Sequence, residues 1–221
     1  MDPIRDDDNN LQDDYDDFGE AARVLADPMR HPVHAAVYDN NLAGLQTCLA
    51  AGHDVDIRNN ESGKTSLMVA VIHNKREAAR ILLQGGADPL LMHAGGNDDY
   101  TPLDIAASRG HDEMACLLWT VLPPETQHRQ SGFLVKAATH GRTSLIQFLL
   151  DTSSEVWDAV VLERALLIAA RKWHLHAATL LLDRKTYTPN SLQAALFAAV
   201  DTKIMLAHDY RGPIYEAVDY T

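Results

Sequence analysis

The segment Gly63-Lys64-Thr65-Ser66 ends like a phosphate-binding loop. Such a loop needs a glycine five residues before Gly63 and a buried strand ahead of it, because backbone N–H groups must wrap around the phosphates. Arg58 stands at the glycine position, and a polar segment precedes the tetrapeptide. We therefore expect Thr65 to open a structural element and not to bind a nucleotide.

Eleven histidines suggest metal binding as a second kind of chemistry. His31 and His34 are three residues apart, whereas His174 and His176 are two apart and would point to different faces of a helix. The chain has no His-Glu-x-x-His pattern, and no carboxylate joins a histidine pair at a spacing that suits zinc. We expect no metal site and no cofactor.

Cys48 and Cys116 lie far apart within apolar runs, which favours two reduced thiols in the core over a disulfide framework. A Gly-x-Ser-x-Gly elbow is absent from the sequence. Nucleophile and base come together in space and not along the chain, so an enzyme remains the alternative to a binding protein. Our expectation is a protein without catalysis.

Composition narrows the choice of partner. The 221 residues are 46% hydrophobic and 23% charged, which is globular, and the net charge is −12. An acidic chain repels phosphate, so we expect neither nucleic acid nor a membrane as partner. No apolar run approaches the roughly 18 residues of a membrane span, and the start is not a secretory signal. We expect a cytoplasmic or nuclear protein.

Three copies of one pattern occupy the first half of the chain. They open at His31-Pro32-Val33-His34-Ala35-Ala36, at Thr65-Ser66-Leu67-Met68-Val69-Ala70 and at Thr101-Pro102-Leu103-Asp104-Ile105-Ala106. The openings lie 34 and 36 residues apart, and each copy continues to a leucine-rich run. This pattern resembles the ankyrin repeat, with its T-P-L-H-x-A opening and its 33-residue period.

Looser copies follow the first three. Leu134–Ala138 and Leu166–Ala170 repeat the opening, although Trp173 replaces the usual glycine in the fifth copy, and a degenerate sixth copy spans Ser191–Ala207. We place the repeat domain at residues 19–221, with repeats starting near 31, 65, 101, 132, 164 and 190. Gly212–Val218 echoes the opening again, so the chain could be one piece of a longer array.

The resemblance implies an all-α solenoid of five to six helix-turn-helix repeats. In each copy a turn enters a first helix, a glycine such as Gly110 or Gly141 ends that helix in the left-handed conformation, and a second helix packs its leucines. No copy can bury its apolar face alone, so stacking stabilises the array.

Residues 1–18 are different in kind, because Asp and Asn dominate them. This composition cannot offset the entropy lost on ordering, so we expect an acidic disordered arm. As a tethered polyanion, the arm could compete with an acidic ligand.

The resemblance also implies that a partner docks in the concave groove, on the exposed side of the first helices. Counted from each opening residue, the exposed positions are near the fifth, eighth and ninth. The candidate groove residues are then Tyr38, Asp39, Ile72, His73, Arg109, Lys136, His140, Arg171 and Lys172. The same register contains Ala35, Val69, Ile105, Ser108, Thr139 and Ile168. Tyr100 follows a glycine-containing loop and is a candidate loop contact.

We therefore expect a protein-interaction module, a scaffold or inhibitor that holds a segment of another protein in its groove. The basic residues near the end of the register favour an acidic or phosphorylated segment. An enzyme or small-molecule-binding protein with a site in the same groove is the alternative. The sequence does not identify the partner or the oligomeric state.

Overall fold

The computed structural model describes residues 31–59, 62–93, 100–153, 157–184 and 187–209, with the side chains after residue 199 excepted. The acidic arm expected at 1–18 and the echo at Gly212–Val218 lie outside the described residues. Within those residues there are twelve α-helices, α2 to α13, and no strand beyond one isolated bridge between Arg58 and Thr65. The expected all-α repeat solenoid is confirmed.

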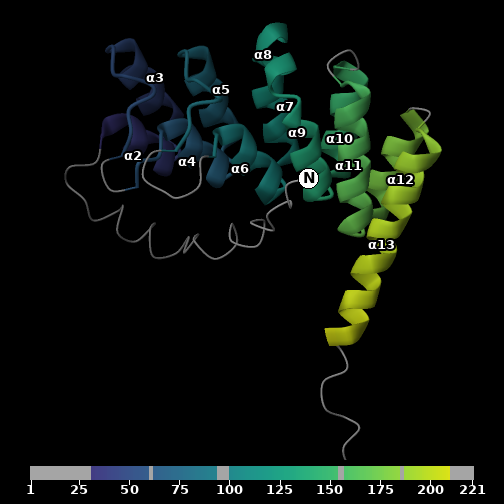
Figure 1. Cartoon of the computed structure of the whole chain (residues 1–221). Helices are drawn as coiled ribbons and strands as arrows, with labels where there is room; N and C mark the ends of the chain where they lie inside the picture. The colour runs from purple at the N-terminus through teal and green to yellow at the C-terminus, as the bar shows by residue number, and fades with distance from the viewer. Residues whose placement is uncertain (1–30, 60–61, 94–99, 154–156, 185–186, 210–221) are drawn as a thin grey trace, which may run out of the picture.

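Figure 1 shows the helices in two rows, with the first helix of every repeat in one row and the second in the other. The first helices are α2 (Pro32–Tyr38), α4 (Ser66–Ile72), α6 (Pro102–Arg109), α9 (Gly132–Thr139), α11 (Ala159–Arg171) and α13 (Pro189–Asp209). The second helices are α3 (Leu42–Ala50), α5 (Arg76–Gln84), α7 (Asp112–Thr120), α10 (Thr143–Thr152) and α12 (Leu175–Arg184). A further helix, α8 (Pro124–Arg129), connects α7 to α9.

Threonine hydroxyls begin two of the first helices. Thr65 Oγ1 accepts a hydrogen bond from Met68 N at 3.2 Å. Thr101 Oγ1 accepts one from Asp104 N at 3.2 Å, and the Asp104 carboxylate accepts one from Thr101 N at 3.1 Å, which completes a capping box. The segment that ends like a phosphate-binding loop is therefore the start of a helix.

One backbone motif ends the first helix of the first five repeats. A residue with positive φ follows each of these helices: Asn40, Asn74, Gly110, Gly141 and Trp173. The N–H group of the next residue donates to a buried alanine carbonyl in every copy, over 2.8–2.9 Å; the acceptors are Ala36, Ala70, Ala106, Ala137 and Ala169. This is the Schellman arrangement. Because alanine is small, it also lets neighbouring first helices pack closely.

A ladder of side chains joins each repeat to the one before it. We define the ladder as Lys75, His111, Arg142 and His174, the residues that directly follow the positive-φ turns of repeats two to five. Each side chain reaches back to carbonyl oxygens at the C-terminal end of the preceding first helix, which lack the helical N–H partner four residues on.

The ladder contacts are short at three of the four steps. Lys75 Nζ donates to the Val37 and Tyr38 carbonyls at 3.0 and 2.6 Å. Arg142 donates to two carbonyls of α6, at 2.9 Å from Nε and 2.7 Å from Nη2. The ring Nε2 atoms of His111 and His174 lie 3.4 and 3.0 Å from carbonyl oxygens of α4 and α9. The negative end of each helix dipole therefore faces a donor of the next repeat.

Aromatic side chains fill the connection between the third and fourth repeats. The Trp119 ring is buried and stacks on Phe133 and Trp157, with ring centroids 5.4 and 5.5 Å apart. Its Nε1 atom donates to Ser153 Oγ at 3.0 Å. The two tryptophans are thus structural.

Gly110 supplies a first test of the ladder. A Cβ atom there would lie 2.4 Å from a guanidinium nitrogen of Arg142, and φ is +75°. Gly110→Ala therefore combines left-handed strain with a shift of the Arg142 guanidinium that weakens its hydrogen bonds, and we expect it to lower the free energy of unfolding by about 2–3 kcal/mol. Gly52→Ala is the control, because φ is +83° there but a Cβ meets nothing within 4 Å. Urea unfolding measures both; equal losses would contradict the ladder's role.

His111 makes the stability depend on pH. Burial lowers the pKa of His111 below its ordinary value, and the nearby Arg109 and Arg142 lower it further. The folded chain thus favours the neutral ring, while the unfolded chain takes up a proton near pH 6.5. The stability that the neutral His111 ring contributes is present above about pH 6.5. It is lost as the pH falls from there toward the lower pKa of the folded chain.

We expect wild type to lose stability between about pH 7.5 and 5.5, and His111→Gln to lose less, because Gln keeps an N–H donor but does not titrate. Denaturant unfolding at both values of pH measures the difference between the two proteins. Parallel losses would show that His111 is not involved.

Candidate functional site

One residue per repeat stands at the outer end of the first helix, directly before the positive-φ residue. These five residues form what we name the turn row: Asp39, His73, Arg109, His140 and Lys172. Asp39 and Lys172 are exposed and the other three are partly exposed. Because the repeats stack, this position recurs once per repeat along the array, and all five were expected on the accessible side.

The expected exposure is wrong for Ile72, Val69 and Ile105, all of which are buried. The physical reason is that α4 has α2 on one side and α6 on the other, with α5 behind it, so that every residue of α4 is buried. Counting positions from the opening residue locates a face of a helix but not the neighbours that cover it.

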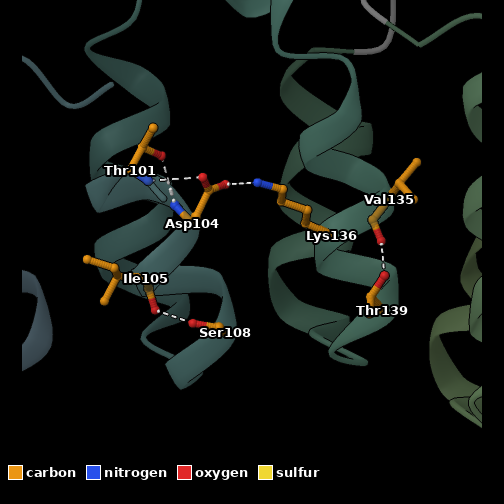
Figure 2. Close-up of polar contacts among 7 residues, drawn as sticks. All are labelled: Thr101, Asp104, Ile105, Ser108, Val135, Lys136 and Thr139. Atoms are coloured by element: carbon orange, nitrogen blue, oxygen red, sulfur yellow. Dashed lines mark hydrogen bonds and ion pairs between the residues drawn. The ribbon is translucent and has the colours of Figure 1, made fainter. Parts of the chain in front are cut away.

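Lys136 is exposed as expected, but its charge has a partner within the chain. Its Nζ atom lies 2.6 Å from Asp104 Oδ1, so that an ion pair joins α9 to α6 (Figure 2). Asp104 also caps its own helix through Thr101. This pairing offsets most of the charge that Lys136 could offer to a ligand.

Two further residues of the expected register bond to their own helices. Ser108 Oγ donates to the Ile105 carbonyl at 3.0 Å and Thr139 Oγ1 donates to the Val135 carbonyl at 2.8 Å, and Figure 2 shows both on the same side as the ion pair. Both hydroxyls remain partly exposed and keep lone pairs that can accept from a partner.

The N-terminal part of the turn row is fixed by internal contacts. The rings of Tyr38 and His73 meet edge to face with centroids 5.6 Å apart. A guanidinium nitrogen of Arg109 donates to the Ile72 carbonyl at 3.3 Å, next to the ladder contact of His111. The side chains are thus held in place before any partner arrives.

The C-terminal part of the turn row combines charge with an exposed aromatic ring. Arg171 is partly exposed and Lys172 exposed, and Trp173 follows them with φ of +61° and 41% exposure. The sequence marks Trp173 only as a substitute for glycine, and its place on the surface was not anticipated. Tryptophan is enriched among residues that dominate binding energy.

Hydrogen bonds join the loop that precedes α4 to the loop that precedes α6. Arg58 Nη1 donates to the carbonyls of Gly63 and Met92, at 3.1 and 2.8 Å. The Tyr100 ring is partly buried and stacks on His93 with centroids 4.6 Å apart, and His93 Nε2 lies 2.7 Å from the Ser62 carbonyl oxygen. Tyr100 therefore stabilises the base of the loop, whose residues 94–99 lie outside the described part of the chain.

Three observations bear on chemistry at this surface. Among the residues that the structure describes, no three His, Cys, Asp or Glu side chains are arranged to hold a metal ion. Burial raises the pKa of the Cys116 thiol to about 11, so that the nucleophilic thiolate is scarce at neutral pH. In the same described part, no helix has both the length and the apolarity to span a membrane.

Comparisons with known proteins agree with the geometry of the repeats. Residues 33–126 match the family model described as ankyrin repeats (3 copies). The nuclear factor NF-kappa-B p105 subunits of Gallus gallus and Mus musculus are each 39% identical to this chain over 87 residues. The ankyrin repeat domain-containing protein oryK of Aspergillus oryzae is 29% identical over 122 residues.

These matches cover 39% of the chain for the p105 subunits and 55% for oryK, but only 8%, 9% and 18% of the respective relatives. The likeness thus concerns the repeats and not the whole of those proteins. Ankyrin repeats are protein-interaction modules. The repeat period, the stacked helix pairs and the match over residues 33–126 together show that this chain contains ankyrin repeats.

Proposed function

We propose that this protein is a non-enzymatic interaction module, a scaffold or inhibitor that binds an extended segment of another protein along the turn row. The observation that carries the proposal is the regularity of the row, which offers one polar side chain in each of five successive repeats. The reduced state of Cys48 and Cys116 suits a cytoplasmic or nuclear partner.

The length of the row suits an extended peptide. Neighbouring packed helices lie roughly 8–10 Å apart, so five repeats span about 32–40 Å. An extended chain advances about 3.3 Å per residue, and a segment of about 10–12 residues would match the row. One in every three of its side chains would meet a turn-row residue. By the same spacing, His73 and His140 are roughly 16–20 Å apart, too far to act together on one small substrate.

Charge along the row favours an acidic or phosphorylated segment. Asp39 stands at the N-terminal end of the row, Arg109 in its middle, and Lys172 at its C-terminal end, next to Arg171. Lys136 is not part of the row and forms an ion pair with Asp104. Guanidinium groups bind carboxylates and phosphates through paired hydrogen bonds, so Arg171 and Lys172 with the neighbouring Trp173 are the expected centre of recognition.

A peptide selection tests this proposal. Peptides of 12 residues selected from a random library on the immobilised protein should be enriched in Asp and Glu. Arg171→Ala combined with Lys172→Ala should weaken the selected peptides by about tenfold, because two cations leave the binding surface. The matched control is Arg80→Ala with Arg129→Ala, which removes the same charge from exposed residues of α5 and α8 and should change affinity less than about twofold.

Fluorescence anisotropy in about 0.15 M salt measures these affinities, and circular dichroism checks that both double variants are folded. Peptides without acidic enrichment, or equal weakening by the two double variants, would contradict the turn row as an acidic-segment site.

A further inference from the structure

The C-terminal end of the array carries an exposed apolar surface, which we name the terminal face. It consists of Leu175 and Leu182 on α12 and Leu192, Leu196 and Phe197 on α13, all between 42% and 65% exposed. Figure 1 shows these two helices at the end of the row. Soluble proteins rarely leave such groups of large apolar side chains uncovered unless they bind something.

Comparison between repeats shows what kind of surface this is. Leu182 lies nine residues after the positive-φ residue of its repeat, and the same offset gives Leu49, Leu83, Trp119 and Leu150 in the earlier repeats. Those four are buried or half-buried. Leu49 lies against Gly85 of the next repeat, where an added Cβ atom would be 3.0 Å from Leu49 Cδ1. This position therefore faces the following repeat, and on α12 the same position is open.

The α13 part of the terminal face lies in an uncharged segment, whereas on α12 the exposed Asp183 follows Leu182. Pro189–Val200 contains no Asp, Glu, Lys or Arg, in a chain that is 23% charged and has a net charge of −12. On α12, Arg184 is paired with Asp151 of the preceding repeat. Two copies of so acidic a chain repel each other over much of their surface, and this repulsion is smallest where neither copy presents charge.

We propose that the terminal face binds a second copy of this chain, face to face about a two-fold axis. A two-fold interface uses the same patch on both subunits, and an apolar patch is complementary to itself. The contact would extend, across two copies of the chain, the packing that stacks one repeat on the next. The turn row is not part of this face, so the dimer would present two turn rows in one particle.

The size of the face sets the strength of the dimer. The ten residues of α12 make a helix about 15 Å long and about 10 Å wide, and the first turns of α13 add a similar strip. Together they cover roughly 300–400 Å² in projection, well under the ~800 Å² per partner of a standard stable interface. We therefore expect a dimer that dissociates at micromolar concentration and forms as the concentration rises.

Sedimentation equilibrium of the full chain tests the proposal, at concentrations from about 5 to about 500 μM, which bracket the affinity expected of a small interface. The average mass of wild type should rise from 24.4 kDa toward twice that value. Leu196→Glu should weaken association at least about tenfold, because it brings two like charges together across the axis. Val160→Glu makes the same kind of change on α11, at a side chain that is 70% exposed outside the face, and should associate like wild type.

Circular dichroism should show both variants folded, since each replaced side chain is mostly exposed. A wild-type chain that stays at 24.4 kDa throughout would overturn the proposal. Equal weakening by the two glutamates would also overturn it, because association would then follow net charge and not the terminal face. Neither outcome bears on peptide binding at the turn row, which is measured separately.

Discussion

The helix ends are the places where this array is held together. The last carbonyl oxygens of α2, α4, α6 and α9 lack the helical N–H partner four residues on, and a side chain of the following repeat donates to them. Lys75, His111, Arg142 and His174 make these contacts at intervals of 36, 31 and 32 residues, which are the intervals of the repeats themselves. Because each donor belongs to a different repeat from its acceptor, these contacts couple neighbouring repeats, and stacking stabilises the copies that they join.

The same contacts shape the candidate binding surface. The turn row stands one residue before each positive-φ turn and two before the ladder position, so the ladder fixes its backbone. Several cations near the C-terminal ends of the first helices have partners within the chain. Arg109 and Arg142 donate to helix carbonyl oxygens, and Lys136 pairs with the Asp104 carboxylate. At the C-terminal end of the row, Lys172 is exposed and lies beside the exposed ring of Trp173.

Much of the fold follows from local sequence signals. The Thr-Pro opening at Thr101, the glycine at Gly110 and the leucine-rich runs predict helix pairs, because capping and left-handed turns are decided within a few residues. The exposure of Ile72 could not be predicted in the same way, since it depends on three neighbouring helices. The pairing of Lys136 was missed for the same reason, whereas the ladder could have been found from its regular spacing.

Arg142 allows the most direct measurement of this coupling. Arg142→Ala removes a guanidinium that donates to two carbonyls of α6, and hydrogen bonds to charged groups each contribute about 1.5–3 kcal/mol. Urea unfolding is followed by circular dichroism and by tryptophan fluorescence. Wild type should give one transition shared by both signals, and the variant should give separate transitions. The reason is that the repeats before and after the boundary between α6 and α9 no longer unfold together. A single transition in the variant, with the wild-type midpoint, would contradict the coupling.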